Sequence, residues 1–390
     1  MAERWDVAIV GAGVSGGSTA YHLMASAGRG LRVLILDPDP SYEFAASARS
    51  AGSIRQQFSM ALNVRMAAYN FAFLQEAGER LAIDGEKADI QFRHGSYLFL
   101  ADTDAALGLA AAYDIQKSAG ADVELLSPAG LAREFPWLDT ADIALASIGR
   151  GGEGWFDGYA FAQALRRKAI SFGAQFRKDA VEAILIAGGR VAGLRAGGAE
   201  IAADKVVCAA GTHGPGLLRS LGVDVPVYPR KRSIFYVRTP FAMDRNIMLI
   251  DTSGVYLRPE GRGYICGVGP RLDPDVALTD FAVDHGLFED VIWPVLAGRI
   301  PQMEQLRVEG AWSGHYDLNI FDHNAIVGAV GEVEGLFLAT GFSGHGLQQS
   351  PSVGRGLAEL ILNGRYTSLD LSPLGLERLA SPARVEHAIV

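Results

Sequence analysis

The sequence predicts an α/β protein, α+β overall, in which a domain with a central parallel sheet is joined to a domain built on an antiparallel sheet capped by helices. Three observations predict this class: a glycine-rich turn at 11–16 between apolar runs, alternation of apolar and polar residues through the middle of the chain, and a second glycine-rich turn at 341–346. At 390 residues the chain is also too long for one ordinary core.

The N-terminal segment has the pattern of one βαβ unit. Residues 7–10 and 33–36 are short apolar runs typical of buried parallel strands, and residues 18–27 between them have the pattern of a helix. We therefore expect two neighbouring parallel strands joined by a right-handed crossover.

The remaining segments divide between the two kinds of sheet. Alternation at 90–100 and 228–268 predicts antiparallel strands with one exposed face. The other expected elements are a helix at 160–172, short strands within 181–211, a strand at 336–339 and a helix at 347–362. This order predicts a cofactor domain at 1–89, 146–222 and 323–370, a substrate domain at 90–145 and 223–322, and a C-terminal tail at 371–390.

Composition excludes several classes of protein. Apolar residues make up 49% of the chain, which excludes a disordered protein. A balance of 35 basic and 44 acidic residues argues against nucleic acid as a partner. The first residues lack a basic leader pattern and no run is apolar enough to span a membrane, so we expect a cytoplasmic protein. Cys208 and Cys266 lie in apolar runs and are expected to be inert buried thiols, and no metal site is expected.

The turn at 11–16 has the spacing of a dinucleotide-binding motif. Its first glycine permits a tight turn, its second lets a pyrophosphate approach the backbone, and its third lets helix and strand pack closely. Asp37 follows by about 20 residues, the spacing at which a carboxylate reaches a ribose hydroxyl. The expected contacts are Gly11, Gly13, Val14, Ser15, Gly16 and Asp37.

Two further segments extend this candidate site. Residues 46–58 are small, hydroxylated and basic, which suits a second phosphate or a flat ring, although a solvated loop is an equal alternative from composition alone. Residues 340–347 offer N–H groups at a helix start, which suits the negative N1/O2 edge of a reduced flavin. The candidate residues are Ser47, Arg49, Ser50, Ala51, Gly52, Gly341, Phe342, Ser343, Gly344, His345, Gly346, Leu347 and Gln348.

With these motifs, nearly the whole chain resembles the D-amino-acid-oxidase superfamily of FAD enzymes. The resemblance also rests on the runs 206–211 and 256–259, and the runs 53–58 and 341–349 are similar to the sarcosine-oxidase-like branch. It adds Val181, Ala210 and Gly211 to the candidate cofactor residues. It implies that an amine passes a hydride, or its equivalent, to flavin N5, that water hydrolyses the resulting imine, and that oxygen, a quinone or another electron carrier accepts the electrons.

The resemblance also implies roles for individual side chains. Tyr256 would line the substrate cavity, and Arg55 or Arg258 would pair with a substrate carboxylate. An ordinary strand tyrosine and surface arginines are the alternatives.

Two departures from the family pattern affect the substrate and the flavin linkage. Tyr316 stands where glycine oxidase and many D-amino-acid enzymes have an arginine for the carboxylate, and Gln348 stands where monomeric sarcosine oxidase has a lysine. That enzyme binds flavin through a cysteine near the position of His315, and other relatives use a histidine where this chain has Arg49. We therefore expect non-covalent FAD, with a link at His315 as the alternative.

The favoured function is oxidation of the C–N bond of a small amino or imino acid, preferably a secondary amine that is N-methylated or cyclic. One alternative is a D-amino acid dehydrogenase, and another is an FAD-containing assembly or interaction protein without amine turnover. An NAD(P)H-dependent flavin reductase would need a second GxGxxG turn, and the glycines within 188–211 do not open a strand-to-helix turn.

Overall fold

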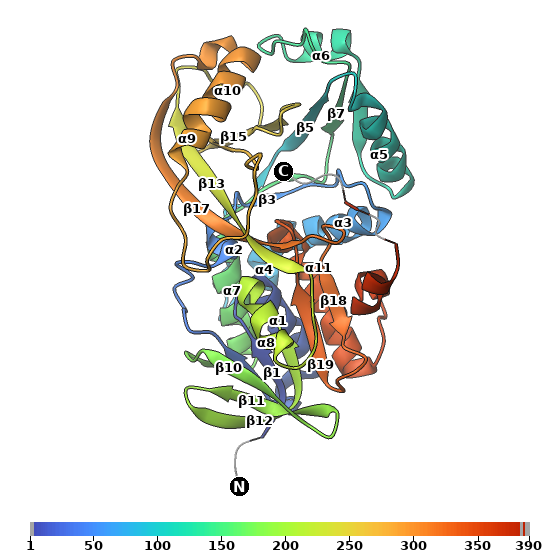
Figure 1. The fold of residues 1–390 in the computed structure, drawn as a ribbon. Helices are drawn as coiled ribbons and strands as arrows, with labels where there is room; N and C mark the ends of the chain where they lie inside the picture. The colour runs from blue at the N-terminus through green and yellow to red at the C-terminus, as the bar shows by residue number, and fades with distance from the viewer. Residues whose placement is uncertain (1–3, 383–384, 387–390) are drawn as a thin grey trace.

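The computed structural model describes residues 4–382 and 385–386. The predicted start of the chain at 1–3 and the tail positions 383–384 and 387–390 lie outside the described residues. Two large sheets form two lobes, one below and one above in Figure 1, with α3 (Ala61–Gln75) between them. The predicted fold class is confirmed, since a sheet whose central strands are parallel lies in one lobe and a largely antiparallel sheet lies in the other.

The lower sheet has the strand order β10-β11-β12-β1-β2-β9, and β12 also pairs with β19, which pairs with β18. The strands are β1 (Arg4–Val10), β2 (Val33–Leu36), β9 (Gln175–Arg177), β10 (Val181–Ala187), β11 (Arg190–Ala196), β12 (Ala199–Cys208), β18 (Ile326–Ala329) and β19 (Leu336–Thr340). Val10 lies beside both Leu36 and Cys208 in parallel register. Because parallel strands end at the same edge, the turns after β1, β2, β12 and β19 gather there.

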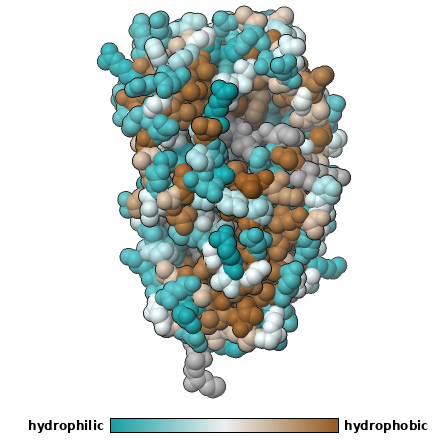
Figure 2. Space-filling view, in the orientation of Figure 1, coloured by the Kyte–Doolittle hydropathy of each residue, from teal (hydrophilic) through white to brown (hydrophobic). Residues whose placement is uncertain are grey.

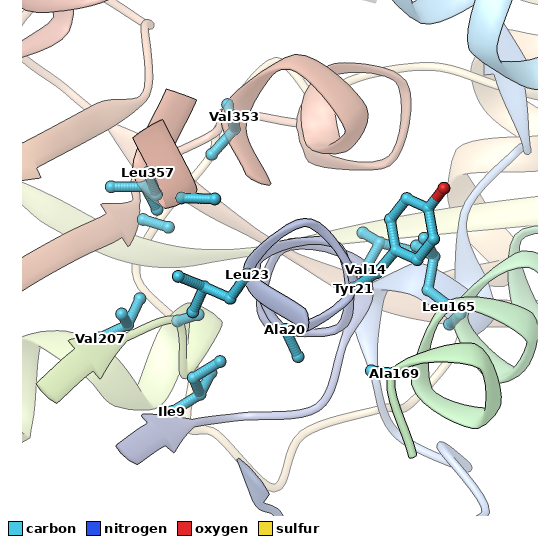
Figure 3. Close-up of a cluster of buried hydrophobic side chains, with 14 of the residues drawn as sticks. Ile9, Val14, Ala20, Tyr21, Leu23, Leu165, Ala169, Val207, Val353 and Leu357 are labelled. Carbon is cyan, nitrogen blue, oxygen red and sulfur yellow. The ribbon is translucent and has the colours of Figure 1, made fainter. Parts of the chain in front are cut away.

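The helix after the first turn, α1 (Val14–Ala27), is buried over most of its length, and only its last three residues are exposed (Figure 3). Side chains from the sheet, from α7 (Gly158–Ser171) and from α11 (Gly346–Asn363) surround it. Gly354 of α11 lies so close that a Cβ there would be 2.2 Å from Ser18 Oγ. The helix begins at Val14, four residues before the predicted start, because the N–H of Gly17 already donates to the carbonyl of Gly13 at 2.8 Å.

The upper sheet has the order β17-β13-β16-β15-β14-β5-β7-β6. Its strands are β5 (Ser96–Ala101), β6 (Val123–Leu126), β7 (Leu145–Gly149), β13 (Val227–Arg238), β14 (Ile247–Ile250), β15 (Tyr256–Glu260), β16 (Gly263–Gly267) and β17 (Arg307–Asn319). Neighbouring strands are antiparallel except β5 and β14, which are parallel. The predicted boundary at residue 146 falls inside β7, which pairs with β5 and β6, so residues 146–149 belong to this sheet. The remaining domain limits stay a prediction.

Helices cover one face of the upper sheet. Among them, α9 (His285–Leu287) and α10 (Trp293–Arg299) lie over β13 and β15 in Figure 1, and α6 (Pro128–Glu134) lies near β7. Helix α5 (Ala106–Ser118) instead packs with α3 and with Val123 of β6. Leu257 of β15 packs with Leu296 in the core beneath the helices, so its strand neighbours Tyr256 and Arg258 point to the opposite face. That face looks toward the lower lobe and forms one wall of the candidate site.

A small third sheet joins the lobes. It contains β3 (Ser53–Ile54), β8 (Gly154–Trp155) and β4 (Arg93–His94), in the order β3-β8-β4. Both cysteines are free and buried, as predicted, and burial raises the pKa of the Cys208 thiol to about 11. Figure 2 shows hydrophilic side chains along the edges of one face and hydrophobic ones toward its middle and lower part. Within the described ranges, every helix is too short or too polar to cross a membrane.

Candidate cofactor and active site

The turn between β1 and α1 leaves no room for side chains at two of its glycines. Gly11 has φ +97°, and a Cβ there would lie 2.4 Å from the carbonyl oxygen of Ala209. A Cβ at Gly16 would lie 1.9 Å from the carbonyl oxygen of Gly11. Ala210 and Gly211 directly follow Ala209, so the turns after β1 and β12 are in contact. Glycine is therefore required for helix and strand to approach this closely.

The two long helices that begin at this edge both start without a side-chain cap. Gly13 precedes α1 and His345 precedes α11, and neither helix has an acidic residue in its first turn. Their first N–H groups and helix dipoles thus favour negative charge. The N–H of Val14 donates to Ser47 Oγ at 3.2 Å, while Ser15 follows it in the first turn. This donor set fits FAD, with the α1 end suited to the pyrophosphate and the α11 end to the N1/O2 edge of the flavin.

Asp37 lies beside the phosphate turn at the end of β2. Its Oδ2 accepts from the N–H of Ala12 at 2.7 Å and its Oδ1 from the N–H of Asp39 at 2.9 Å. Each carboxylate oxygen can accept a second hydrogen bond, so a ribose diol can still donate to Asp37. Burial raises the pKa of this carboxyl. Tyr42, which the sequence reasoning missed, donates from its hydroxyl to the carbonyl of Ala12 at 2.6 Å and holds the same turn.

The loop after α2 (Ala46–Arg49) lies between the phosphate turn and the upper sheet. Ser50 Oγ accepts from the N–H of Gly52 at 3.1 Å, and Gly52 has φ +69°. A Cβ at Gly52 would lie 2.3 Å from the carbonyl oxygen of Phe156. Ala51 packs against the cluster of Tyr97, Met248, Ile250 and Tyr256, so the loop is held at the wall of the upper sheet.

The C-terminal turn, residues 341–346, is held by Asp317 of β17. Asp317 Oδ2 accepts from the N–H of Gly341 at 2.8 Å, and its backbone carbonyl accepts from the N–H of Ser343 at 3.1 Å. Burial raises the pKa of Asp317 to about 6. Ser343 adopts a left-handed φ of +54° and its Oγ accepts from the N–H of Asn319 at 3.0 Å. These hydrogen bonds fix the loop. Leu347, near the start of α11, then packs into the core with Phe342.

Arg55 joins the N-terminal and C-terminal segments. Its backbone N–H donates to Gln348 Oε1 at 3.0 Å, and its Nη2 lies 3.2 Å from His345 Nε2. The guanidinium lies 4.4 Å from the ring centroid of Phe58, and Phe58 meets His345 edge to face at 5.2 Å. Arg55 is only 3% exposed, so a positive charge is buried where the two loops meet.

Aromatic rings line the side of the site formed by the upper sheet. Tyr97 stacks on Phe99 at 5.9 Å, and the Arg55 guanidinium lies within 6 Å of both rings. Tyr256 packs with Tyr97. Burial raises the pKa of Tyr256 well above its ordinary value, and the neighbouring Tyr316 adds to this rise. A Cβ at Gly344 would lie 2.4 Å from Tyr316 Cε2, so the Tyr316 ring lies on the C-terminal turn. A cation beside aromatic rings suits a small acid with an apolar portion.

Two predicted residues make contacts other than those predicted for them. His315 points to the opposite side of β17 from Tyr316, stacks on Phe281 at 4.3 Å, and its Nε2 lies 2.7 Å from the Asp280 carbonyl oxygen. Arg258 donates to the carbonyls of Ala51 and Pro259 and to Glu260, so its donors hold the loop and the strand end.

Two predicted cofactor residues are likewise engaged elsewhere. Arg49 donates to the carbonyls of Glu43 and Ser313, and its guanidinium lies 5.0 Å from the ring centroids of both Phe44 and Phe281. Val181 begins β10 and packs at the margin of the core that contains Val10 and Leu36.

Sequence reasoning missed Asp317, Glu153 and Tyr97, and it gave Arg232 only as part of a candidate basic pocket for a small anion at 229–232. Arg232 of β13 pairs with both carboxylate oxygens of Asp273 at 2.7 Å, and its guanidinium lies 5.0 Å from the Tyr316 ring centroid. One available signal was an isolated acid in an otherwise apolar or glycine-rich context, as at Glu153 between two glycines. A buried acid needs donors, and such donors gather where loops are held in place.

Comparison with known proteins identifies the family. The model of the DAO family, described as FAD dependent oxidoreductase, matches residues 6–360. The chain therefore belongs to the DAO family of FAD-dependent oxidoreductases. FAD-dependent oxidoreductase domain-containing protein 1 of Xenopus laevis is 39% identical over 415 residues, which cover 97% of this chain and 83% of that protein.

Two solved structures have the same fold over their whole length. L-proline dehydrogenase from P. horikoshii has a TM-score of 0.86 at 24% identity, covering 98% of this chain and 100% of that one. Glycine oxidase from Geobacillus kaustophilus has a TM-score of 0.82 at 27% identity, covering 96% of this chain and 98% of that one.

Proposed function

We propose that this FAD-dependent oxidoreductase oxidises the C–N bond of a small amino or imino acid, with an N-methylated or cyclic secondary amine preferred, as in the sarcosine-oxidase-like branch. The observation that carries the proposal is the buried Arg55 guanidinium, which lies beside the rings of Phe58, Tyr97 and Phe99. A guanidinium suits the two oxygens of a carboxylate, and the rings suit the apolar part of a small acid. The names of L-proline dehydrogenase and glycine oxidase place amino acids among the substrates of related folds.

Each group in the site has a separate task in this proposal. Arg55 binds the carboxylate, and His345 and Gln348 hold Arg55 in place. Tyr256 and Tyr316 enclose the amine and exclude water. Gly11, Gly13, Asp37, Ser47 and the turn at 341–346 would hold FAD non-covalently, FAD would supply the two-electron acceptor, and water would hydrolyse the imine product. The electrons leave for oxygen, a quinone or another carrier.

Tyr316 disfavours ordinary D-amino acids as substrates. Its ring occupies the position that carries a carboxylate-binding arginine in glycine oxidase and many D-amino-acid enzymes, and it lies directly on Gly344. The carboxylate is thereby assigned to Arg55, which lies beside the rings of Tyr97 and Phe99. This assignment disfavours a D-amino acid dehydrogenase. A cytoplasmic location remains part of the proposal.

Anaerobic mixing tests the proposal. The purified yellow protein is mixed with glycine, D-amino acids, N-methyl amino acids and cyclic imino acids, and the visible flavin absorption is followed. Bleaching by secondary amines at lower concentrations than by primary ones is the expected result. Flavin that stays oxidised under every amine contradicts the proposal and favours an assembly or interaction protein that retains FAD.

A further inference from the structure

A buried carboxylate, that of Glu153, lies behind Arg55. Glu153 precedes β8, is 1% exposed, and stands between Gly152 and Gly154. A Cβ at Gly149 would lie 1.9 Å from Glu153 Oε2, so the carboxylate fills the space that a side chain at position 149 would need. The described structure therefore encloses this acid on all sides.

The hydrogen bonds to Glu153 come from amide groups on two different segments. Its Oε1 accepts from the N–H of Gln56 at 3.1 Å and from Gln57 Nε2 at 3.2 Å. Its Oε2 accepts from the N–H of Tyr97 at 2.7 Å. Burial raises the pKa of Glu153 to about 7, while these donors and the charge of Arg55 act against that rise. Donors of this kind stabilise the ionised carboxylate.

The same hydrogen bonds fix the residues that hold Arg55. Arg55 Nε donates to the carbonyl of Gln57 at 3.2 Å, and Gln57 Oε1 accepts from Ser147 Oγ at 2.7 Å. The side-chain amide of Gln57 is therefore held at both its nitrogen and its oxygen, and the backbone carbonyl of Gln57 points at the Arg55 guanidinium. Tyr97, whose N–H binds Glu153, also places its ring beside Arg55.

We infer that Glu153 is a positioning residue, which fixes Arg55 and the Tyr97 ring for recognition of a substrate carboxylate. This inference rests on the proposed function, because it takes Arg55 as the group that binds the carboxylate. Glu153 does not touch the substrate in this arrangement. It acts through the backbone of residues 56 and 57 and through β5.

The test compares the affinity of FAD-loaded variants for small unreactive acids. Acetate and benzoate are titrated into the parent protein, Glu153→Gln and Glu124→Gln, and binding is followed by the change in flavin absorption. Glu124 is a matched control, since its exposed carboxylate pairs with Arg150 at the surface. Glu153→Gln is expected to weaken acid binding at least tenfold without loss of FAD, and Glu124→Gln to change it less than twofold. Equal affinities in all three proteins overturn the inference.

A double-variant cycle separates positioning from a general structural role. If Glu153 acts through Arg55, Glu153→Gln adds little to the loss already caused by Arg55→Lys. Fully additive losses, or an equal loss for a neutral ligand such as benzamide, overturn the inference. Glu153→Asp, which keeps the charge, is the second variant if Glu153→Gln does not fold. Amine bleaching of the parent protein tests the proposed function separately, so acid binding that is sensitive to Glu153 without any bleaching contradicts only the proposed function.

Discussion

The Nη2 atom of Arg55 lies 3.2 Å from Nε2 of His345, although 290 positions separate the two residues in the chain. The contact closes the site between the loop after β3 and the turn before α11. Lysine cannot reproduce the planar fork of donors that arginine offers, so Arg55→Lys tests the carboxylate contact directly.

We expect Arg55→Lys to lower kcat/KM for amino acid oxidation by roughly 10- to 100-fold, which corresponds to about 1.4–2.8 kcal/mol. The measurement is the rate of anaerobic flavin reduction against substrate concentration. Arg65→Lys, on the exposed side of α3, serves as the control and should leave the rate unchanged. A fully active Arg55→Lys variant would remove Arg55 from the substrate site.

Gly16→Ala should disrupt the phosphate turn. The added Cβ would lie 1.9 Å from the carbonyl oxygen of Gly11, so α1 must move away from β1. Overpacking of this kind costs about 1–3 kcal/mol, and the displaced helix N-terminus should bind FAD poorly. Bound flavin per chain and the thermal unfolding midpoint measure both effects. Gly216→Ala, where a Cβ meets nothing within 4 Å, should retain FAD, and equal behaviour of the two variants would contradict this prediction.

Tyr256→Phe should slow turnover or raise KM without releasing FAD. The ring stays in the wall with Tyr97 and Met248, and only the buried hydroxyl is lost. The loss of one hydrogen bond to substrate corresponds to about 1 kcal/mol, or roughly fivefold in kcat/KM. Steady-state kinetics and the flavin content of the purified variant provide the comparison. Loss of the cofactor would show that Tyr256 belongs to the FAD site instead.

Asp317→Asn should change how stability depends on pH. Burial raises the pKa of the Asp317 carboxyl from 3.8 to about 6, so between these values the folded state holds a proton that the unfolded chain has released. The contribution of Asp317 to the free energy of unfolding is thus fully present below about pH 4 and falls as the pH rises through about 6.

Asparagine does not titrate. As the pH rises from about 4 to about 7, the free energy of unfolding of the variant should therefore increase by about 1–3 kcal/mol relative to that of the parent. Denaturant unfolding at a series of pH values measures the difference. Asp104→Asn, at an exposed position, should give a difference that does not vary with pH. If the difference in the free energy of unfolding between Asp317→Asn and the parent also stays constant with pH, the raised pKa of Asp317 does not contribute to stability as predicted.

Denaturation should release all of the flavin. His315 points to the side of β17 opposite Tyr316, where it stacks on Phe281 and its Nε2 donates to the Asp280 carbonyl, and Arg49 donates to carbonyls of two segments, so both side chains are held in contacts of their own. After acid precipitation, FAD should remain in the supernatant and the intact mass should equal that of the polypeptide. A mass increase equal to FAD would show a covalent bond, and His315→Ala would then identify its position.

The sequence by itself determined the elements that depend on local pattern. The spacing of Gly11, Gly13 and Gly16 between two apolar runs indicated a strand, a turn and a helix, because only glycine permits the left-handed turn and the close approach of α1 to β1. Alternation at 228–268 likewise predicted antiparallel strands, such as β15 and β16. These features follow from backbone geometry and from burial within a few residues.

The tertiary structure alone decided which distant residues meet. Nothing near Arg55 in the sequence identifies His345, Gln348 or Glu153 as its neighbours, because their contacts depend on how the two lobes pack. The same packing turned Arg258 toward the Ala51 carbonyl and His315 away from the site, although both looked like candidate ligands in the sequence. Hydrogen bonds and charge pairs act over a few ångströms of space, and separation along the chain does not specify that distance.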